Sequence, residues 1–204
     1  MILYLTKQTI DRYKVEMPEE MASPHKEISA ALVQKEQEDR LLEWGGKLFY
    51  FDRKKCIQFV NFASKFTLFL VDVKKDILPQ ASNIIANYLL ELYIDDKEMT
   101  DALHTMLKDH PLSCFGKLKD KSTISTLNYT PRAFLEDGYR LYDYIDPEGV
   151  LHTMDINYDV NFKWLCSFTV DGKKDYEYSG ERFRQMMLER YGGRSSKPVL
   201  RLVK

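Results

Sequence analysis

The sequence contains little cysteine, no long apolar run and almost no net charge. Its three cysteines are widely spaced, and no pair has the CxxC spacing of a redox or zinc motif. No stretch approaches the ~18 apolar residues of a membrane span, and the N-terminal apolar run is shorter than the ~7–15 residues of a signal-peptide core. The formal net charge of −1 gives no whole-molecule attraction to nucleic acid or acidic lipid. These absences exclude a disulfide scaffold and a membrane protein, and they predict a cytoplasmic chain that does not bind membranes.

What the chain does contain is the composition of an ordinary folded domain. It has 204 residues, of which 44% are apolar and 30% charged, a length that fits about one domain at ~150 residues per domain. No repeat or low-complexity stretch interrupts it, and the polar segment 117–123 is the best candidate boundary. We therefore predict a single α+β domain over residues 1–204, with a weak subdivision near 117–123 and a basic C-terminal tail over 194–204.

Three apolar segments in quick succession predict the centre of a β-sheet. They cover 47–51, 55–61 and 66–71, and the links between them are too short for parallel crossovers. We expect Phe59 in the core of this meander, and Trp44 buried at the junction between a helix and the sheet. The expected fold is α+β: an antiparallel sheet built on a central meander and packed against several helices.

Apolar spacing, prolines and capping residues predict the remaining elements. The expected strands are 1–5, 150–156 and a hairpin of 161–170 with 174–178 that turns at Asp171-Gly172. The expected helices are 6–14, 24–42, one that follows Pro79, one from Asp95 to Pro111, one that opens at Thr130-Pro131, and one from Ser179 to Gly192. Gly45-Gly46 is expected to end the helix over 24–42, and segment 117–123 is expected to be a loop.

Two segments carry a family resemblance. In the first, Glu43-Trp44 precedes a strand, a basic turn and a second strand that contains Cys56 and ends in Asn. In the second, the run 122–128 ends in Asn and precedes an aromatic helix that carries Phe134-Leu135. Over residues 1–145 the chain resembles an uncharacterised bacterial domain family. The resemblance implies a fold, and it implies no activity, because that family has no assigned catalytic residues.

No motif in the sequence predicts a catalytic residue, a metal ligand or a cofactor. His104, His110 and Cys114 lie near one another in the chain, but their spacing puts the histidines on different faces of a helix. The glycines form neither a dinucleotide-binding loop nor a Walker loop. Cys56 and Cys166 are expected to pack inside strands, whereas Cys114 is expected in a loop as a half-buried thiol and the one plausible reactive cysteine. We therefore expect no cofactor and no metal, and an enzyme is disfavoured.

Opposite charges gather in two neighbouring segments of the C-terminal third. Residues 132–159 carry seven carboxylates against two arginines, with tyrosines interleaved, and residues 180–204 carry seven basic side chains against two glutamates. The candidate binding residues for phosphates or an acidic partner are Arg182, Arg190, Arg194, Lys197 and Arg201. In the alternative interpretation, 198–203 folds back as an edge strand, and its charges are solvated or paired to the acidic segment.

Two functions from different classes remain open. The first is a non-enzymatic interaction module that binds a protein, a second copy of itself or, through the basic segment, nucleic acid. The alternative is a small-molecule-binding domain or an enzyme with an aromatic-lined pocket between the sheet and its helices. A pocket with converging polar side chains favours the alternative, and a convex surface that carries patches favours the first.

Overall fold

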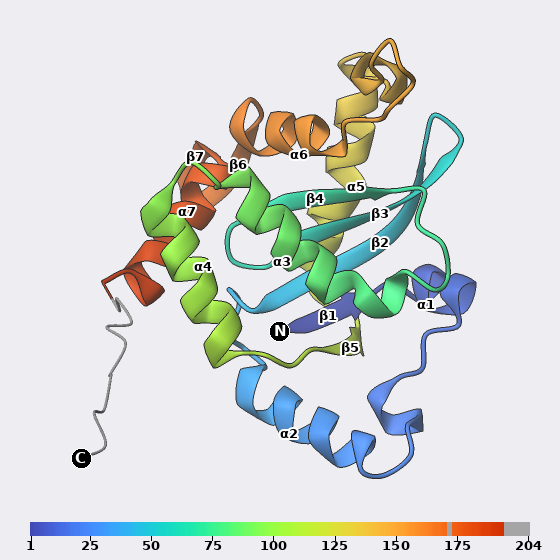
Figure 1. Ribbon diagram of the computed structural model, residues 1–204, viewed down its shortest axis with the longest axis vertical. Coiled ribbons are helices and arrows are strands. Elements are labelled where there is room, and N and C mark those ends of the chain that lie inside the picture. The colour runs from blue at the N-terminus through green and yellow to red at the C-terminus, as the bar shows by residue number, and fades with distance from the viewer. Residues whose placement is uncertain (171–172, 194–204) are drawn as a thin grey trace, which may run out of the picture.

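The structure is a computed structural model that describes residues 1–170 and 173–193 (Figure 1). Its strands form a five-stranded sheet in the order β4-β3-β2-β1-β5 and a separate hairpin, β6-β7. The strands are β1 (Ile2–Leu5), β2 (Glu43–Phe51), β3 (Lys54–Asn61), β4 (Thr67–Val71), β5 (Cys114–Lys117), β6 (Leu165–Val170) and β7 (Lys173–Tyr178). The α-helices are α1 (Lys7–Tyr13), α2 (His25–Glu36), α3 (Ala81–Leu92), α4 (Lys97–Asp109), α5 (Lys121–Glu136), α6 (Thr153–Phe162) and α7 (Ser179–Tyr191). Short 3₁₀ turns are η1 (Pro18–Glu20), η2 (Leu78–Gln80) and η3 (Leu141–Tyr144).

The predicted α+β class and the antiparallel β2-β3-β4 meander are confirmed. The sheet is mixed, however, because β1 pairs in parallel with β2 on one side and with β5 on the other. The chain between β1 and β2 holds α1 and α2, so it is long enough for a parallel crossover. The meander therefore forms one half of the sheet. Its strand β4 is an edge, and β2 is the central strand.

Helices cover both faces of the sheet (Figure 1). On one face, α3, α4 and α7 pack on the main apolar cluster, which includes Leu3, Phe59 and Phe183. On the other face, α5 packs on β2 and β3 near Phe134, and α2 packs on β1 and β5. Trp44 is buried between Phe66 and Phe183, and Phe59 is fully buried, as the sequence predicted.

Gly45 and Gly46 do not end a helix, because α2 stops at Glu36 and both glycines lie inside β2. Their role is close packing. A Cβ at Gly45 would lie 2.4 Å from the Thr123 side chain, and one at Gly46 would lie 2.6 Å from Leu5. The glycines thus allow α5 and β1 to approach the central strand.

Two further predictions about single elements are wrong. Pro131 lies inside α5, which begins at Lys121, so the end of the expected 117–123 loop is helical. That earlier start is fixed by Asp120, whose side chain accepts a hydrogen bond from the Thr123 N–H at 2.7 Å. The expected strand over 150–156 is instead an isolated bridge at Leu151 followed by α6. The predicted turn at Asp171-Gly172 lies outside the described residues, although β6 and β7 flank it as expected.

The free edge of β4 explains why α6 is a helix. Asn157 accepts a hydrogen bond from the Phe69 N–H at 2.6 Å and donates to the Phe69 carbonyl at 3.2 Å. Asn161, one turn later, makes the same pair of bonds with Thr67 at 2.8 and 2.6 Å. These amides satisfy backbone groups that another strand would otherwise pair, so α6 closes this edge of the sheet.

Candidate ligand-binding pocket

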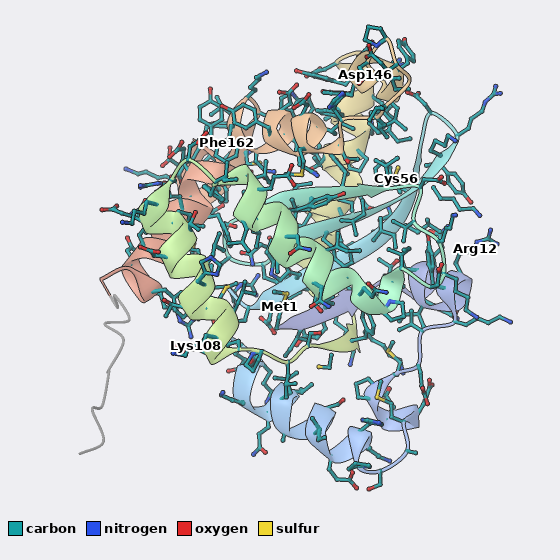
Figure 2. All side chains as sticks on the ribbon, viewed as in Figure 1. Met1, Arg12, Cys56, Lys108, Asp146 and Phe162 are labelled. Carbon is teal, nitrogen blue, oxygen red and sulfur yellow. The ribbon has the colours of Figure 1, made fainter. Side chains whose placement is uncertain are left out.

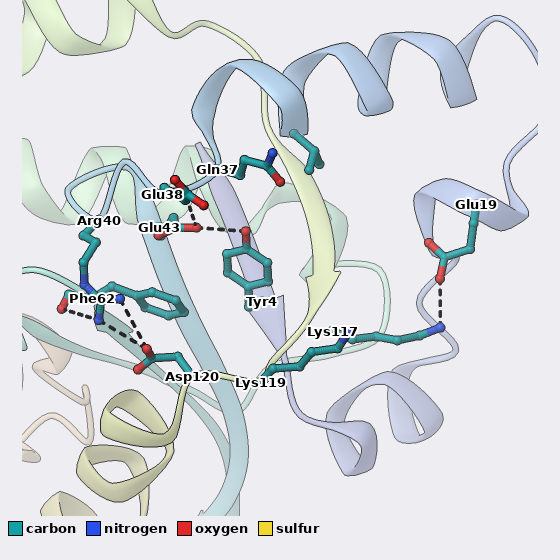
Figure 3. Close-up of a pocket in the computed structure, with 11 residues that line it drawn as sticks. Tyr4, Glu19, Gln37, Glu38, Arg40, Glu43, Phe62, Lys117, Lys119 and Asp120 are labelled. Atoms are coloured by element: carbon teal, nitrogen blue, oxygen red, sulfur yellow. Dashed lines mark hydrogen bonds and ion pairs between the residues drawn. The ribbon is translucent and has the colours of Figure 1, made fainter.

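A pocket of about 560 Å³ lies on the face of the sheet that α2 and α5 cover (Figure 3). The end of α2, the start of β2 and the segment between β5 and α5 surround it. Its lining is a mixture of aromatic and charged side chains: Tyr4, Glu19, Val33, Gln37, Glu38, Arg40, Glu43, Phe62, Lys117, Lys119 and Asp120. Three of these side chains are aromatic or apolar and eight are polar or charged, so the pocket combines a small aromatic surface with many polar groups.

Strand β1 places the Tyr4 ring in this pocket. Alternation along the strand points Leu3 and Leu5 into the main core and Tyr4 to the opposite face. The two residues opposite Tyr4 in the neighbouring strands are both glycines, Gly45 and Gly116. A Cβ at Gly116 would lie 2.8 Å from the Tyr4 ring, so the ring occupies space that any other residue would fill.

The other side of the Tyr4 ring stacks on Phe62, which follows β3. The two ring centroids are 5.4 Å apart and the planes are inclined by 23°. The Arg40 guanidinium lies over the Phe62 ring at 5.2 Å, within the range of a cation–π contact. The pocket therefore has an aromatic floor of two rings, and Arg40 stands at its border.

Glu43 is the buried acid of the pocket. It opens β2 and is only 6% exposed, and one of its carboxylate oxygens accepts hydrogen bonds from the Tyr4 hydroxyl at 2.9 Å and the Glu38 N–H at 3.3 Å. The chain can present that N–H because it turns sharply after α2, with Glu38 at a φ of 73°. Among the described residues no cation lies within ion-pair distance of Glu43. The pocket thus contains a carboxylate with spare acceptor capacity.

Tyr4 is fixed as a proton donor. Burial raises the pKa of its hydroxyl well above the ordinary value, and the hydrogen bond to Glu43 raises it further. The Tyr4 hydroxyl therefore keeps its proton and donates it in the hydrogen bond to Glu43. This fixes the position of the Glu43 carboxylate in the pocket wall.

Two ion pairs border the pocket. Arg40 donates to the Asp120 carboxylate at 3.3 Å and to the Phe62 carbonyl at 3.3 Å. Burial works to raise the pKa of Asp120, but hydrogen bonds from Thr123 and Arg40 outweigh it and lower that pKa. Opposite, Lys117 contacts Glu19 of η1 at 2.8 Å, and both side chains are more than half exposed. The first pair joins two elements of the pocket wall, and the second is a solvent-screened contact across the edge strand β5.

The cysteines and histidines do not assemble into a reactive centre in the described part of the chain. Cys114 lies in β5 and is 6% exposed, so the expected loop position is wrong and the thiol is buried rather than half-buried. Burial raises the pKa of Cys56 to about 12 and that of Cys114 to about 11, which disfavours the thiolate. His110 Nδ1 lies 2.8 Å from Glu36, whose carboxylate also contacts the Met1 ammonium. The described residues contain no group of three or more metal-ligating side chains that could hold an ion.

Two of the five predicted binding residues lie in the described chain, and both contact its own carboxylates. Arg182 pairs with Glu177 at 3.1 Å and covers the Phe168 ring at 4.3 Å. Arg190 pairs with Asp39 at 2.5 Å, which raises the Arg190 pKa. Arg194, Lys197 and Arg201, together with the alternative edge strand over 198–203, lie outside the described residues.

The acidic segment forms the end of α5, η3 and α6, where Figure 2 labels Asp146 far from the sheet. Its carboxylates make local contacts, among them Asp146 with His152 at 2.9 Å and Asp159 with the Tyr144 hydroxyl at 3.1 Å. Tyr142 and Tyr158 are exposed there. Neither this segment nor the described arginines of α7 contribute to the pocket.

Comparison with known proteins gives one match. Residues 2–182 match the model of a domain of unknown function (DUF6933). The match extends past residue 145, where the sequence resemblance ended, through α6 and the hairpin into α7. No curated protein and no solved structure matches the chain. No helix among the described residues is long and apolar enough to cross a membrane.

Proposed function

We propose that this chain, which belongs to the DUF6933 family of domains of unknown function, is a non-enzymatic binding module. Its ligand lies in the Tyr4 pocket and presents an N–H donor group, such as an amine, amidine or guanidine, to Glu43. This proposal combines the two functions that the sequence left open: a module that binds, with an aromatic-lined pocket between sheet and helix as its site. The free thiols fit a reducing compartment, and we propose the bacterial cytoplasm.

The observation that carries the proposal is the buried carboxylate of Glu43. A carboxylate removed from water costs free energy unless cations or hydrogen-bond donors compensate it. Two neutral donors contact one oxygen of Glu43. Of the three cations that line the pocket, Arg40 pairs with Asp120 and Lys117 with Glu19, and Lys119 lies outside ion-pair distance of Glu43. A ligand that donates N–H groups to Glu43 would complete this set.

The aromatic floor favours a planar donor group. Tyr4 and Phe62, which stack on each other, line the pocket beside Glu43, and amidines and guanidines are flat, cationic groups that pack favourably against aromatic side chains. Tyr4 keeps its proton and orients Glu43, so both residues act as positioning and binding groups.

Titration with benzamidine, a planar aromatic amidine, tests the proposal. We expect saturable binding by calorimetry at fixed ionic strength, and we expect Glu43→Gln to weaken it at least about tenfold, since hydrogen bonds to charged groups contribute about 1.5–3 kcal/mol. The Gln side chain retains an oxygen that can accept from Tyr4 and Glu38, so the fold should persist, and circular dichroism checks this.

Glu38→Gln is the matched control, because Glu38 lines the same pocket but is exposed. It should change benzamidine affinity less than about threefold, as expected for a screened surface charge. Absence of binding to the wild-type protein, or equal binding by the Glu43→Gln variant, would overturn the proposal. Native mass spectrometry of the purified protein gives an independent measurement, since a retained small amine would appear as a mass difference lost on denaturation.

A further inference from the structure

A second hollow of about 450 Å³ adjoins the Tyr4 pocket. The two share the side chains of Tyr4, Glu19, Val33 and Gln37, so they meet at the Tyr4 ring. We call the hollow that contains Glu43 the polar arm and the second hollow the apolar arm. They lie side by side beneath α2, one toward α5 and the other toward the edge strand β5.

The arms differ in chemistry. The polar arm is bordered by the carboxylates and bases described above, with Glu43 buried in its wall. The apolar residues that line the apolar arm are Ile2, Pro18, Ala30, Val33 and Phe115, and Gln34 and Gln37 of the α2 end add two amides. Its charged members, Glu19 and Lys26, are exposed residues on η1 and α2. Gly116 also lines this arm, and the Tyr4 ring packs directly against it.

We infer that the two arms form one site for a small amphipathic molecule, with an amine, amidine or guanidine head at Glu43 and a short apolar tail between α2 and β5. This inference rests on the proposed function and adds the class of ligand. Each volume lies in the range of ~300–1,000 Å³ that small-molecule sites occupy, and a polar anchor beside an apolar channel selects against purely polar amines.

The Glu19–Lys117 ion pair lies at the junction of the arms. Glu19 lines both arms, Lys117 lines the polar arm, and their 2.8 Å contact joins the end of β5 to η1 (Figure 3). Both side chains are exposed, so solvent screens their attraction and the contact can open for an entering tail. The pair therefore borders the path between the arms.

A series of n-alkylguanidines of increasing tail length tests the inference. From methylguanidine to hexylguanidine, below any micelle concentration, we expect affinity to rise roughly fourfold for each methylene that is buried. Ala30→Trp places a large ring in the apolar arm and should abolish this rise while benzamidine still binds. Ala31→Trp is the matched control, because Ala31 is an exposed neighbour on α2 that lines neither arm.

The outcomes separate the two proposals. If benzamidine binds through Glu43 but affinity does not rise with tail length, the apolar arm is not part of the site and the proposed function stands. An equal rise in the Ala30→Trp variant would place the tail elsewhere and overturn the inference. If tail length raises affinity but Glu43→Gln has no effect, the guanidinium is not recognised and both proposals fail.

Discussion

Asn157→Leu should destabilise the protein far more than an ordinary surface substitution. Asn157 is fully buried and makes both of its hydrogen bonds to the backbone of Phe69 on the edge strand β4. Leucine has a similar volume, so the change removes the amide without opening a large cavity. The Phe69 N–H and carbonyl would then lie beneath α6 without these partners.

The size of the effect follows from those two backbone groups. Each buried group left unsatisfied costs about 1–3 kcal/mol, and the added apolar contacts of leucine offset about 1 kcal/mol. We expect the free energy of unfolding to fall by about 1–5 kcal/mol, a large part of the 5–15 kcal/mol typical of a domain. The exposed β4 edge should also promote association.

Urea unfolding followed by circular dichroism measures this loss, and size-exclusion chromatography reports association. Asn87→Leu is the matched control, since Asn87 is exposed on α3, a helix of similar length; it should change stability by less than about 0.5 kcal/mol. A loss below about 1 kcal/mol for Asn157→Leu would show that the amide does not protect the β4 edge, and the account of α6 would be wrong.

Two further predictions concern the pocket and the core. Gly116→Ala would place a Cβ 2.8 Å from the Tyr4 ring, so the ring must move, and benzamidine affinity should fall several-fold. The same substitution in a Tyr4→Ala background should have no added effect on affinity. Equal losses of affinity in both backgrounds would refute the role of the ring. Burial raises the Cys56 pKa from 9.0 to about 12, so the folded state keeps a proton that the unfolded chain releases. This stabilisation is complete below pH 9 and is lost as pH rises toward about 12. Urea unfolding across that range should show a shallower decline for Cys56→Val, and an unchanged decline would contradict the assignment.

The parts of the fold that the sequence predicted are those that neighbours in the chain determine. The β2–β3 link is a tight turn with Asp52 and Arg53 at positive φ, and so short a connection permits only antiparallel pairing. The parallel partners of β1 are set instead by long-range packing of α1 and α2. Helix α6 was missed because its β-branched and asparagine residues have weak helix propensity, and bonds to a strand far away in sequence outweigh that propensity.

The pocket could not be predicted for the same reason. Tyr4, Glu43 and Lys117 come from three strands that meet only through the parallel pairs β1–β2 and β1–β5. Two local signals were present: the Glu43-Trp44 pair, which the family resemblance singled out without a role, and glycines inside strand patterns. The sequence pattern predicts that Gly45-Gly46 ends a helix. A glycine inside a strand, however, also marks a place where another group approaches the backbone closely. In this sheet Gly45 and Gly116 lie on either side of Tyr4.

The charge pattern shows why composition alone pointed to a different site. The excess of positive charge in the basic segment 180–204 is visible in the sequence. In the structure, however, Arg182 forms an ion pair with Glu177 of β7, and Arg190 forms one with Asp39 in the loop after α2. Glu43 adds nothing unusual to the composition, and only its burial without a cation makes it informative. A buried charge with no opposite charge beside it is a better indicator of a binding site than an excess of exposed charge. The nucleic-acid hypothesis depends on residues 194–204 and stays a prediction, and the Glu43 pocket is the stronger candidate for a ligand site.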